Sequence, residues 1–417
     1  MRKNTSLLDT KVESLRELIN HIDAHKDIYV DTNYEQGELP ILMEPKLISH
    51  AFTADSFNEE VIFSLLARIK QAGKQSVASL FRVYIEGKAN QDEETAFMYS
   101  ERHDGENLAE YYERISKGKK FGVVINGAEQ WSDDFSRFAV RSFSPIVEKM
   151  GYDCASLEVT LFIGNYGYTP FGIHVDDPYT QVVHFHMGPS AKSMTLFEPE
   201  HFHQLNGPSQ NCYNPDDIIE HGETFEIKPG DIFLLPAHYY HVGNTKEFSI
   251  GVAVSISKNP KNLVTQNLLR DAIYDKRFAG DFETVKSNLE QSQITLADWL
   301  TERHEDHYLK NKSQRALRYA YTEPDIPDFD SETRFIMDPD FKMEIIEAED
   351  KIRLFCRGNK LKLTSNELVG DFLTTLSLKE GDFNIDEMYE EINQGFSQDD
   401  LAYFISMFYS FGVIHLK

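Results

Sequence analysis

Apolar residues recur with two periodicities along the chain. The spacing is helical near both ends and of β-strand type in the middle. Apolar positions recur at helical spacing over 5–25 and 61–69, and Ser132 predicts the capped start of an amphipathic helix that ends near Gly151. We expect no helix of useful length between 157 and 256, a texture typical of a sandwich or jelly roll. Short β-type runs punctuated by Gly and Pro are predicted at 80–85, 121–126, 157–163, 180–187, 194–197, 224–227, 231–235 and 248–256.

The chain returns to helical periodicity after residue 258. Helices are predicted at 263–274, 282–289 and 296–308, and an acidic, proline-containing joint follows at 323–330. The remaining strands and helices come in an order similar to that of a winged helix, at 342–346, 352–356, 368–376, 385–392, 401–408 and 413–416. We therefore expect a β-rich domain with N-terminal helices (1–258), a helical segment (259–330) and a winged-helix-like tail (331–417). The apolar spacing of the helical segment fits a core-covering layer and a dimer seam equally well.

The net charge limits the kinds of binding partner that we expect, and the cysteine content indicates the cellular compartment. The 42 Lys and Arg residues against 68 Asp and Glu residues give a formal net charge of −26, which disfavours nucleic acid and anionic membranes as partners. Between 365 and 417, ten acidic residues stand against two lysines, the reverse of a DNA-reading footprint. The three cysteines lie far apart without metal-binding spacing, which suits a reducing cytoplasm. We expect neither a signal peptide nor a membrane-spanning stretch.

The residues that could carry chemistry belong to two separated motifs. His174 and Asp176 lie two residues apart, so on an extended strand both side chains point to one face. A third ligand must come from another strand, and His241 lies five residues beyond Pro236. We expect the chain to bend after Pro236 and return His241 to the barrel mouth. Two imidazoles and one carboxylate leave open coordination positions, the arrangement that suits non-haem Fe(II) oxygenases.

These motifs resemble the JmjC group of cupin-type 2-oxoglutarate oxygenases over roughly residues 121–257. The resemblance rests on a His-x-Asp motif followed by Pro-Gly-Asp and then by Pro-x-x-x-x-His. The resemblance implies an α+β chain whose core is a double-stranded β-helix, the jelly roll of the cupin fold. It also implies Fe(II) held by His174, Asp176 and His241, with 2-oxoglutarate and O2 as co-substrates.

A co-substrate handle is also implied by the resemblance. Members of the group hold the distal carboxylate of 2-oxoglutarate with a cation on the strand after the metal motif, and Lys192 resembles that residue. A buried carboxylate needs such a charged, hydrogen-bonding partner. Thr169 resembles the hydroxyl residue that precedes the metal motif in some members, at a longer spacing than usual.

The order of the three parts is similar to that of the ribosomal-oxygenase branch of this group. That resemblance implies a homodimer formed through the helical segment and hydroxylation of a side chain in a protein substrate. One position departs from the branch, because Ala253 stands where a larger polar residue is expected.

Other polar residues near the motifs are expected to have structural roles. His184 and His186 share one face of a strand, where we expect them to line the barrel through hydrogen bonds rather than bind the ion. His201 and His203 are expected in a surface loop. Asp177 should point away from the ion, because neighbouring strand residues face opposite sides.

The sequence thus predicts an Fe(II)- and 2-oxoglutarate-dependent oxygenase that hydroxylates a side chain of a protein or peptide. The acidic surface suggests a basic peptide or a ribosomal protein as substrate, and a modified peptide natural product is equally allowed. Two alternatives stay open. One is a cupin that uses its metal as a Lewis acid in a non-oxidative reaction and has no need of Lys192. The other is a non-catalytic scaffold whose acidic tail recognises a basic or leader-type peptide.

Overall fold

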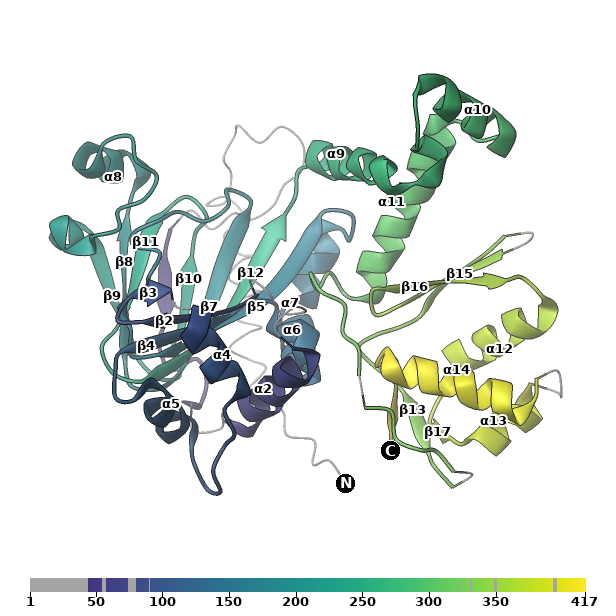
Figure 1. Ribbon diagram of the computed structural model, residues 1–417, viewed down its shortest axis with the longest axis horizontal. Helices are drawn as coiled ribbons and strands as arrows, with labels where there is room; N and C mark the ends of the chain where they lie inside the picture. The colour runs from purple at the N-terminus through teal and green to yellow at the C-terminus, as the bar shows by residue number, and fades with distance from the viewer. Residues whose placement is uncertain are drawn as a thin grey trace. The chain divides into compact units, whose positions relative to one another are not determined.

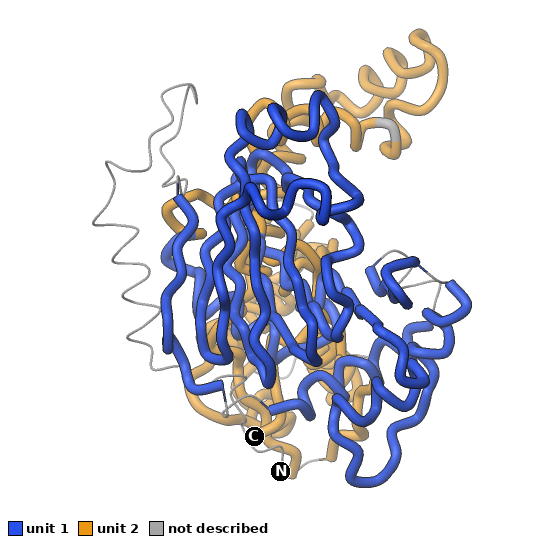
Figure 2. The backbone as a smooth tube through the Cα atoms, turned by 90° about the vertical axis from the view of Figure 1, so that its left-hand side faces the viewer, with its two compact units in different colours: residues 1–146, 157–258 blue, residues 147–156, 259–417 orange. Residues whose placement is uncertain are grey.

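The chain forms two compact units (Figure 1). Unit 1 comprises residues 1–146 and 157–258, and unit 2 comprises residues 147–156 and 259–417, coloured blue and orange in Figure 2. The structure is a computed structural model that describes residues 44–54, 58–73, 80–89, 91–323, 325–330, 332–348, 351–392 and 396–417. The helix predicted over 5–25 lies outside these residues, and the separation of 259–330 from 331–417 stays a prediction.

The larger sheet of unit 1 has eight strands among the described residues, in the order β1-β10-β7-β12-β5-β4-β2-β3. The strands are β1 (Lys46–Ile48), β2 (Phe81–Ile85), β3 (Lys88–Ala89), β4 (Phe121–Ile125), β5 (Ala155–Gly164), β7 (Thr180–Pro189), β10 (Ile232–Leu235) and β12 (Ser249–Lys258). β7 pairs antiparallel with β10 and β12, which places His184 opposite Phe233 and Ala253. Because side chains alternate along a strand, His184 and His186 share one face of β7 and Phe185 lies on the other.

The smaller sheet has four strands in the described part of the chain, in the order β6-β11-β8-β9. These are β6 (Gly167–Tyr168), β8 (Lys192–Phe197), β9 (Glu223–Ile227) and β11 (Tyr240–Thr245). Met194 and Leu196 of this sheet pack in one buried cluster with Phe233 and Leu235 of the larger sheet. The two sheets therefore meet face to face, and the inner face of β7 is the one that carries His184.

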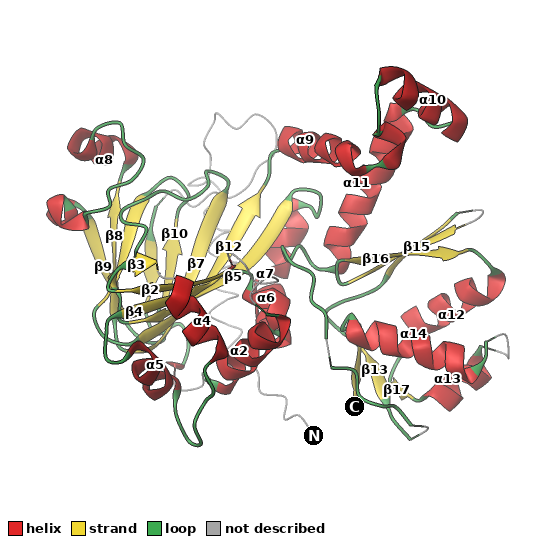
Figure 3. Cartoon of the chain, in the orientation of Figure 1, coloured by secondary structure: helices red, strands yellow, loops and turns green. Residues whose placement is uncertain are grey.

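Helix α7 (Asp133–Met150) covers the outer face of the larger sheet. Its Phe138 and Phe143 pack edge-on against Phe185 of β7, with ring centroids 4.9 and 6.3 Å apart. Ser132 caps the helix as predicted, because its Oγ accepts a hydrogen bond from the Phe135 amide. The other helices of unit 1, red in Figure 3, are α2 (Glu60–Ala72), α4 (Gln91–Tyr99), α5 (Leu108–Ser116), α6 (Ala128–Trp131) and α8 (Pro199–Asn206).

Helix α8 contradicts the prediction of no helix between 157 and 256. Pro199 occupies its first turn, where a missing backbone N–H costs no hydrogen bond, and Phe202 is fully buried. The helix has only eight residues, too few turns for its periodicity to stand out. His201 is exposed as expected, but the prediction for His203 is wrong: it is half-buried in α8, and its Nδ1–H donates to the Gly207 carbonyl at 3.0 Å.

Unit 2 combines helices with two sheets of three strands each, counted over its described residues. Its helices are α9 (Lys261–Asp271), α10 (Phe282–Ser292), α11 (Leu296–Ser313), α12 (Glu367–Ser377), α13 (Ile385–Glu391) and α14 (Gln398–Ser410). One sheet has the order β14 (Glu344–Glu347), β15 (Lys351–Cys356), β16 (Asn359–Thr364); the other has the order β17 (Asp382–Phe383), β13 (Phe335–Met337), β18 (Ile414–Leu416). Phe372, Phe383 and Phe408 belong to the buried core that joins the last three helices to these strands.

The mixture of helices with large antiparallel sheets confirms the predicted α+β class. The jelly-roll topology and the winged-helix-like nature of the tail stay predictions. β11 was not predicted as a strand, because Gly243 and Asn244 interrupt its apolar pattern. Within the described part of the chain, every helix falls short of the length and apolar content that a membrane span requires.

Candidate metal centre

The structure brings together the three residues that the sequence predicts as metal ligands. The candidate ligand atoms of His174, Asp176 and His241 lie within 4.8 Å of one another. The Nε2 atom of His174 is 3.8 Å from Asp176 Oδ1, and that of His241 is 3.9 Å from Asp176 Oδ2. A shared ion would draw these atoms closer, because metal bonds to imidazole and carboxylate are about 2 Å long.

Backbone pairing sets the two imidazoles side by side. The His174 amide donates to the His241 carbonyl at 3.1 Å, and the His241 amide donates to the His174 carbonyl at 2.7 Å. The predicted bend after Pro236 is a turn at 237–238, from which β11 starts. Asp176 lies beyond this bridge and outside any strand, so a loop rather than strand alternation places its carboxylate at the centre.

Hydrogen bonds orient both imidazoles with one nitrogen toward the centre. The Nδ1–H of His174 donates to the Gly172 carbonyl at 3.0 Å, and the Nδ1–H of His241 donates to the Tyr239 carbonyl at 3.3 Å. Each bond leaves the Nε2 lone pair for an ion, the usual arrangement of metal-binding histidines. Burial lowers the pKa of His241, which keeps its imidazole in the neutral form that binds metal.

Lys192 is a buried cation at the start of β8. Lys192 is 5% exposed, and burial lowers the pKa of its ammonium group to about 8. No carboxylate of the described residues forms an ion pair with it, and its Nζ lies 5.8 Å from the centroid of the Phe162 ring. A buried charge without a partner is unfavourable, so this position suits an anionic ligand.

Thr169 lies beside Lys192 and has an unsatisfied hydroxyl. Its Oγ1 is buried without a hydrogen-bond partner among the described residues. A Cβ added at Gly243 would lie 3.5 Å from Thr169 Cγ2 and 3.6 Å from Lys192 Nζ, so both side chains flank this glycine. Gly243 is two residues beyond His241 on β11 and therefore shares its face. We call Lys192 and Thr169 the anion patch; it lies on the same inner face as the candidate metal centre.

The remaining polar residues of this region divide into those that behave as predicted and one that does not. The Nε2–H of His186 donates to the Ser190 carbonyl at 2.7 Å, as expected, while its buried Nδ1 has no partner among the described residues. Asp177 lies outside the group of three and its Oδ1 accepts from the Tyr179 amide. His184 differs, because its buried Nε2 has no hydrogen-bond partner in the described structure. Burial and the charge of Lys192 hold the pKa of His184 well below its usual range. Sequence reasoning gave His184 no functional role, although it shares the inner face with Lys192.

Comparisons with known proteins give matches among solved structures. No protein-family model and no curated protein matches the chain. The ribosomal oxygenase YcfD from Escherichia coli, in complex with cobalt and succinic acid, is similar at 11% identity and a TM-score of 0.46, over 90% of this chain and 95% of that one. Its complex with cobalt and 2-oxoglutarate is similar at 11% identity and a TM-score of 0.44 over the same shares. The non-haem α-ketoglutarate-dependent epimerase SnoN from nogalamycin biosynthesis has 12% identity and a TM-score of 0.26, over 49% of this chain and 87% of that chain.

Proposed function

We propose that this protein is an Fe(II)- and 2-oxoglutarate-dependent oxygenase that hydroxylates a side chain of a protein or peptide. One observation carries the proposal: two imidazoles and a carboxylate come together beside a buried lysine that has no ion pair among the described residues. The ligand set suits Fe(II) with open positions, and the lysine suits a co-substrate with a second carboxylate. A non-oxidative cupin would have no use for this buried cation. The proposal includes a jelly-roll topology for the two sheets.

Two groups of residues have different proposed roles: one would bind Fe(II), and the other would bind 2-oxoglutarate. His174, Asp176 and His241 would hold Fe(II), and their backbone bonds fix which imidazole nitrogen each histidine offers. Lys192 and the Thr169 hydroxyl would bind the far carboxylate of 2-oxoglutarate, so that its keto-acid end reaches the ion. When bound, Fe(II) supplies the redox chemistry by which 2-oxoglutarate and O2 give succinate, CO2 and a hydroxylated product.

The test is succinate formation from 2-oxoglutarate by Fe(II)-loaded protein exposed to O2. We expect metal-dependent succinate that disappears in His174→Ala and falls in Lys192→Ala. The variant His201→Ala is the matched control, because this exposed histidine of α8 lies outside the candidate ligand group. An absence of succinate, together with no binding of Fe(II) or 2-oxoglutarate in titrations, would leave the scaffold alternative.

Substrate class, tail and compartment follow from charge and cysteine chemistry. We propose a basic protein or peptide substrate rather than nucleic acid, supported by the net charge of −26. We also propose that 331–417 is winged-helix-like; α14, the helix that would read DNA in such a fold, contains neither Lys nor Arg. A cytoplasmic location is supported by the three cysteines, which are buried and form no disulfide in the described part of the chain.

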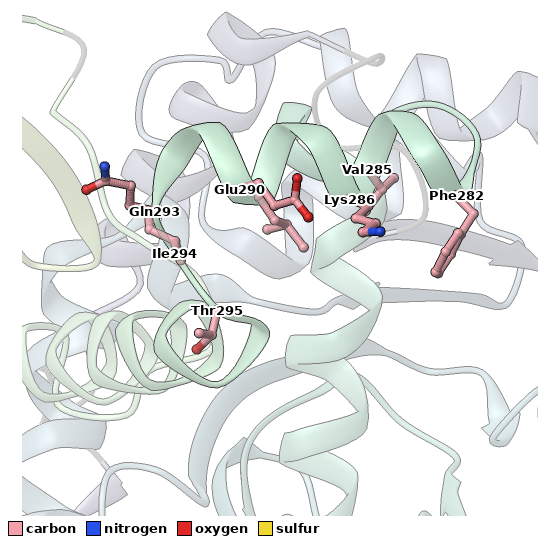
Figure 4. A pocket seen from close by; sticks show the side chains of 8 residues that line it. Phe282, Val285, Lys286, Glu290, Gln293, Ile294 and Thr295 are labelled. Carbon is pink, nitrogen blue, oxygen red and sulfur yellow. The ribbon is translucent and has the colours of Figure 1, made fainter.

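We propose that the protein is a homodimer formed through the helices of 259–330. Support comes from an apolar groove along α10 and the turn into α11, lined by Phe282, Val285, Leu289 and Ile294 among others (Figure 4). Phe282 is 76% exposed, and α10 has no buried residue among those described. A second copy of this helical segment would remove these side chains from water.

A further inference from the structure

His184 is a buried polar residue that the proposed function leaves unused. It is 3% exposed on the inner face of β7, and its Nε2 has no hydrogen-bond partner among the described residues. Buried polar atoms are almost always hydrogen-bonded, because an unmet hydrogen bond in the interior is unfavourable. His184 therefore needs either a structural partner, which the described chain does not provide, or a ligand.

The neighbouring strand makes room for this imidazole. A Cβ added at Gly251 of β12 would lie 2.4 Å from His184 Cε1 and 2.8 Å from its Nε2, closer than real Cβ atoms approach. The pairing of β12 with β7 also shifts register between Ile250 and Gly251, and such irregularities redirect side chains. A glycine and a register shift thus coincide at the point where the His184 ring lies.

The surroundings of His184 connect it to the anion patch. The ring of Phe162 lies with its centroid 6.4 Å from the His184 ring and 5.8 Å from Lys192 Nζ. Burial and the Lys192 charge keep the imidazole neutral, so it offers one N–H donor and one acceptor. A buried carboxylate needs several hydrogen bonds, and Lys192 together with the Thr169 hydroxyl leaves acceptor positions of its two oxygens for a further donor.

We propose that His184 donates a hydrogen bond to the distal carboxylate of 2-oxoglutarate beside Lys192, and that it thereby makes the site selective for a dicarboxylate. This inference rests on the proposed function and deepens it. His184 is a specificity residue: it contacts the end of the co-substrate that does not react. Gly251 is a positioning residue for it.

The test compares two keto acids of equal chain length that differ in the distal carboxylate. Co(II)-loaded full-length protein is titrated without O2 with 2-oxoglutarate and with 2-oxopentanoate, and dissociation constants are measured by calorimetry. We expect His184→Leu to weaken 2-oxoglutarate binding by about tenfold or more, because the lost hydrogen bond is to a charged group. Binding of 2-oxopentanoate should stay within about twofold of the original chain, and His184→Gln, which keeps an N–H donor, should retain most of the preference.

Two further variants keep the result interpretable. His186→Gln is the matched control, because the one N–H of the neutral His186 imidazole already donates to the Ser190 carbonyl and none remains for a carboxylate; its keto-acid preference should be unchanged. Gly251→Ala should reproduce the loss seen in His184→Leu by displacing the ring. Unchanged Co(II) affinity in each variant shows that the fold is intact.

The outcomes separate this inference from the function on which it rests. Equal weakening of both keto acids in His184→Leu, or no weakening of either, overturns the role of His184. Failure of the unmodified protein to bind 2-oxoglutarate at all overturns the proposed function instead.

Discussion

Binding of 2-oxoglutarate should depend on pH through Lys192. Burial lowers the pKa of this lysine to about 8 when no carboxylate is bound, and only the protonated ammonium attracts the acid. Below that pH the site is ready to bind, whereas above it each binding event must also take up a proton. The dissociation constant of 2-oxoglutarate should therefore rise about tenfold for each pH unit above 8, and roughly tenfold between pH 7 and pH 9.

The assay is an oxygen-free titration of the Co(II)-loaded protein with 2-oxoglutarate across this pH range. Lys192→Arg is the matched control, because a guanidinium stays charged throughout and should make the dissociation constant insensitive to pH up to 9. 2-Oxopentanoate serves as the control ligand, since it has no distal carboxylate for Lys192 to bind. A constant affinity of the unmodified protein between pH 7 and pH 9, or the same slope in Lys192→Arg, would refute the reasoning.

Three further predictions follow from buried or exposed side chains. Lys192→Met should raise the free energy of unfolding by about 3 kcal/mol at pH 7, because the pKa of this lysine falls from 10.5 to about 8 on folding. The gain should shrink as pH rises from 8 to 10.5, where the unfolded chain also loses the proton; denaturant titrations at several pH values measure it, and a loss of stability at pH 7 contradicts it. Phe202→Ala should lower stability by about 3–5 kcal/mol and weaken Co(II) binding, because Phe202 stacks on Tyr240, the neighbour of His241, at 3.9 Å between centroids. Unchanged Co(II) affinity in a calorimetric titration would show that the stacking of Phe202 on Tyr240 does not affect metal binding by His241. Phe282→Asp should give a monomer in sedimentation experiments in which the original chain is a dimer, whereas Glu283→Lys should not; a dimer that survives Phe282→Asp excludes this surface.

The sequence predicts those parts of the fold whose pattern is local. Ser132 and the apolar spacing after it predict α7, and the short runs around Phe185 and Phe233 predict β7 and β10, because capping and alternation act over a few residues. β11 and α8 are not predicted from the sequence, because contacts with segments distant in the chain stabilise them. Phe202 of α8 stacks on Tyr240 of β11, a contact between segments more than thirty residues apart.

The sequence likewise predicts one part of the candidate site, the metal ligands, and does not predict the other, His184. Residue types and spacing point to His174, Asp176 and His241, since each ligand type is visible in the sequence and the turn after Pro236 is signalled by proline. From the sequence, His184 could not be distinguished from an ordinary interior histidine, because only the assembled sheets show that its Nε2 has no hydrogen-bond partner among the described residues. Only the register of β7 against β12 reveals that Gly251 leaves space for it.

The paired backbone bonds between His174 and His241 have a consequence for how the protein would bind the proposed metal ion. Two of the three candidate ligands are joined through main-chain amides and carbonyls, so their separation is set when the sheet forms and before any ion arrives. In small zinc domains the ion supplies much of the folding energy and a chelator unfolds the chain. Here the chain should fold without the ion, and the ion should exchange in the folded protein. Removal of the proposed iron should abolish activity without unfolding the chain, and added iron should restore activity without refolding.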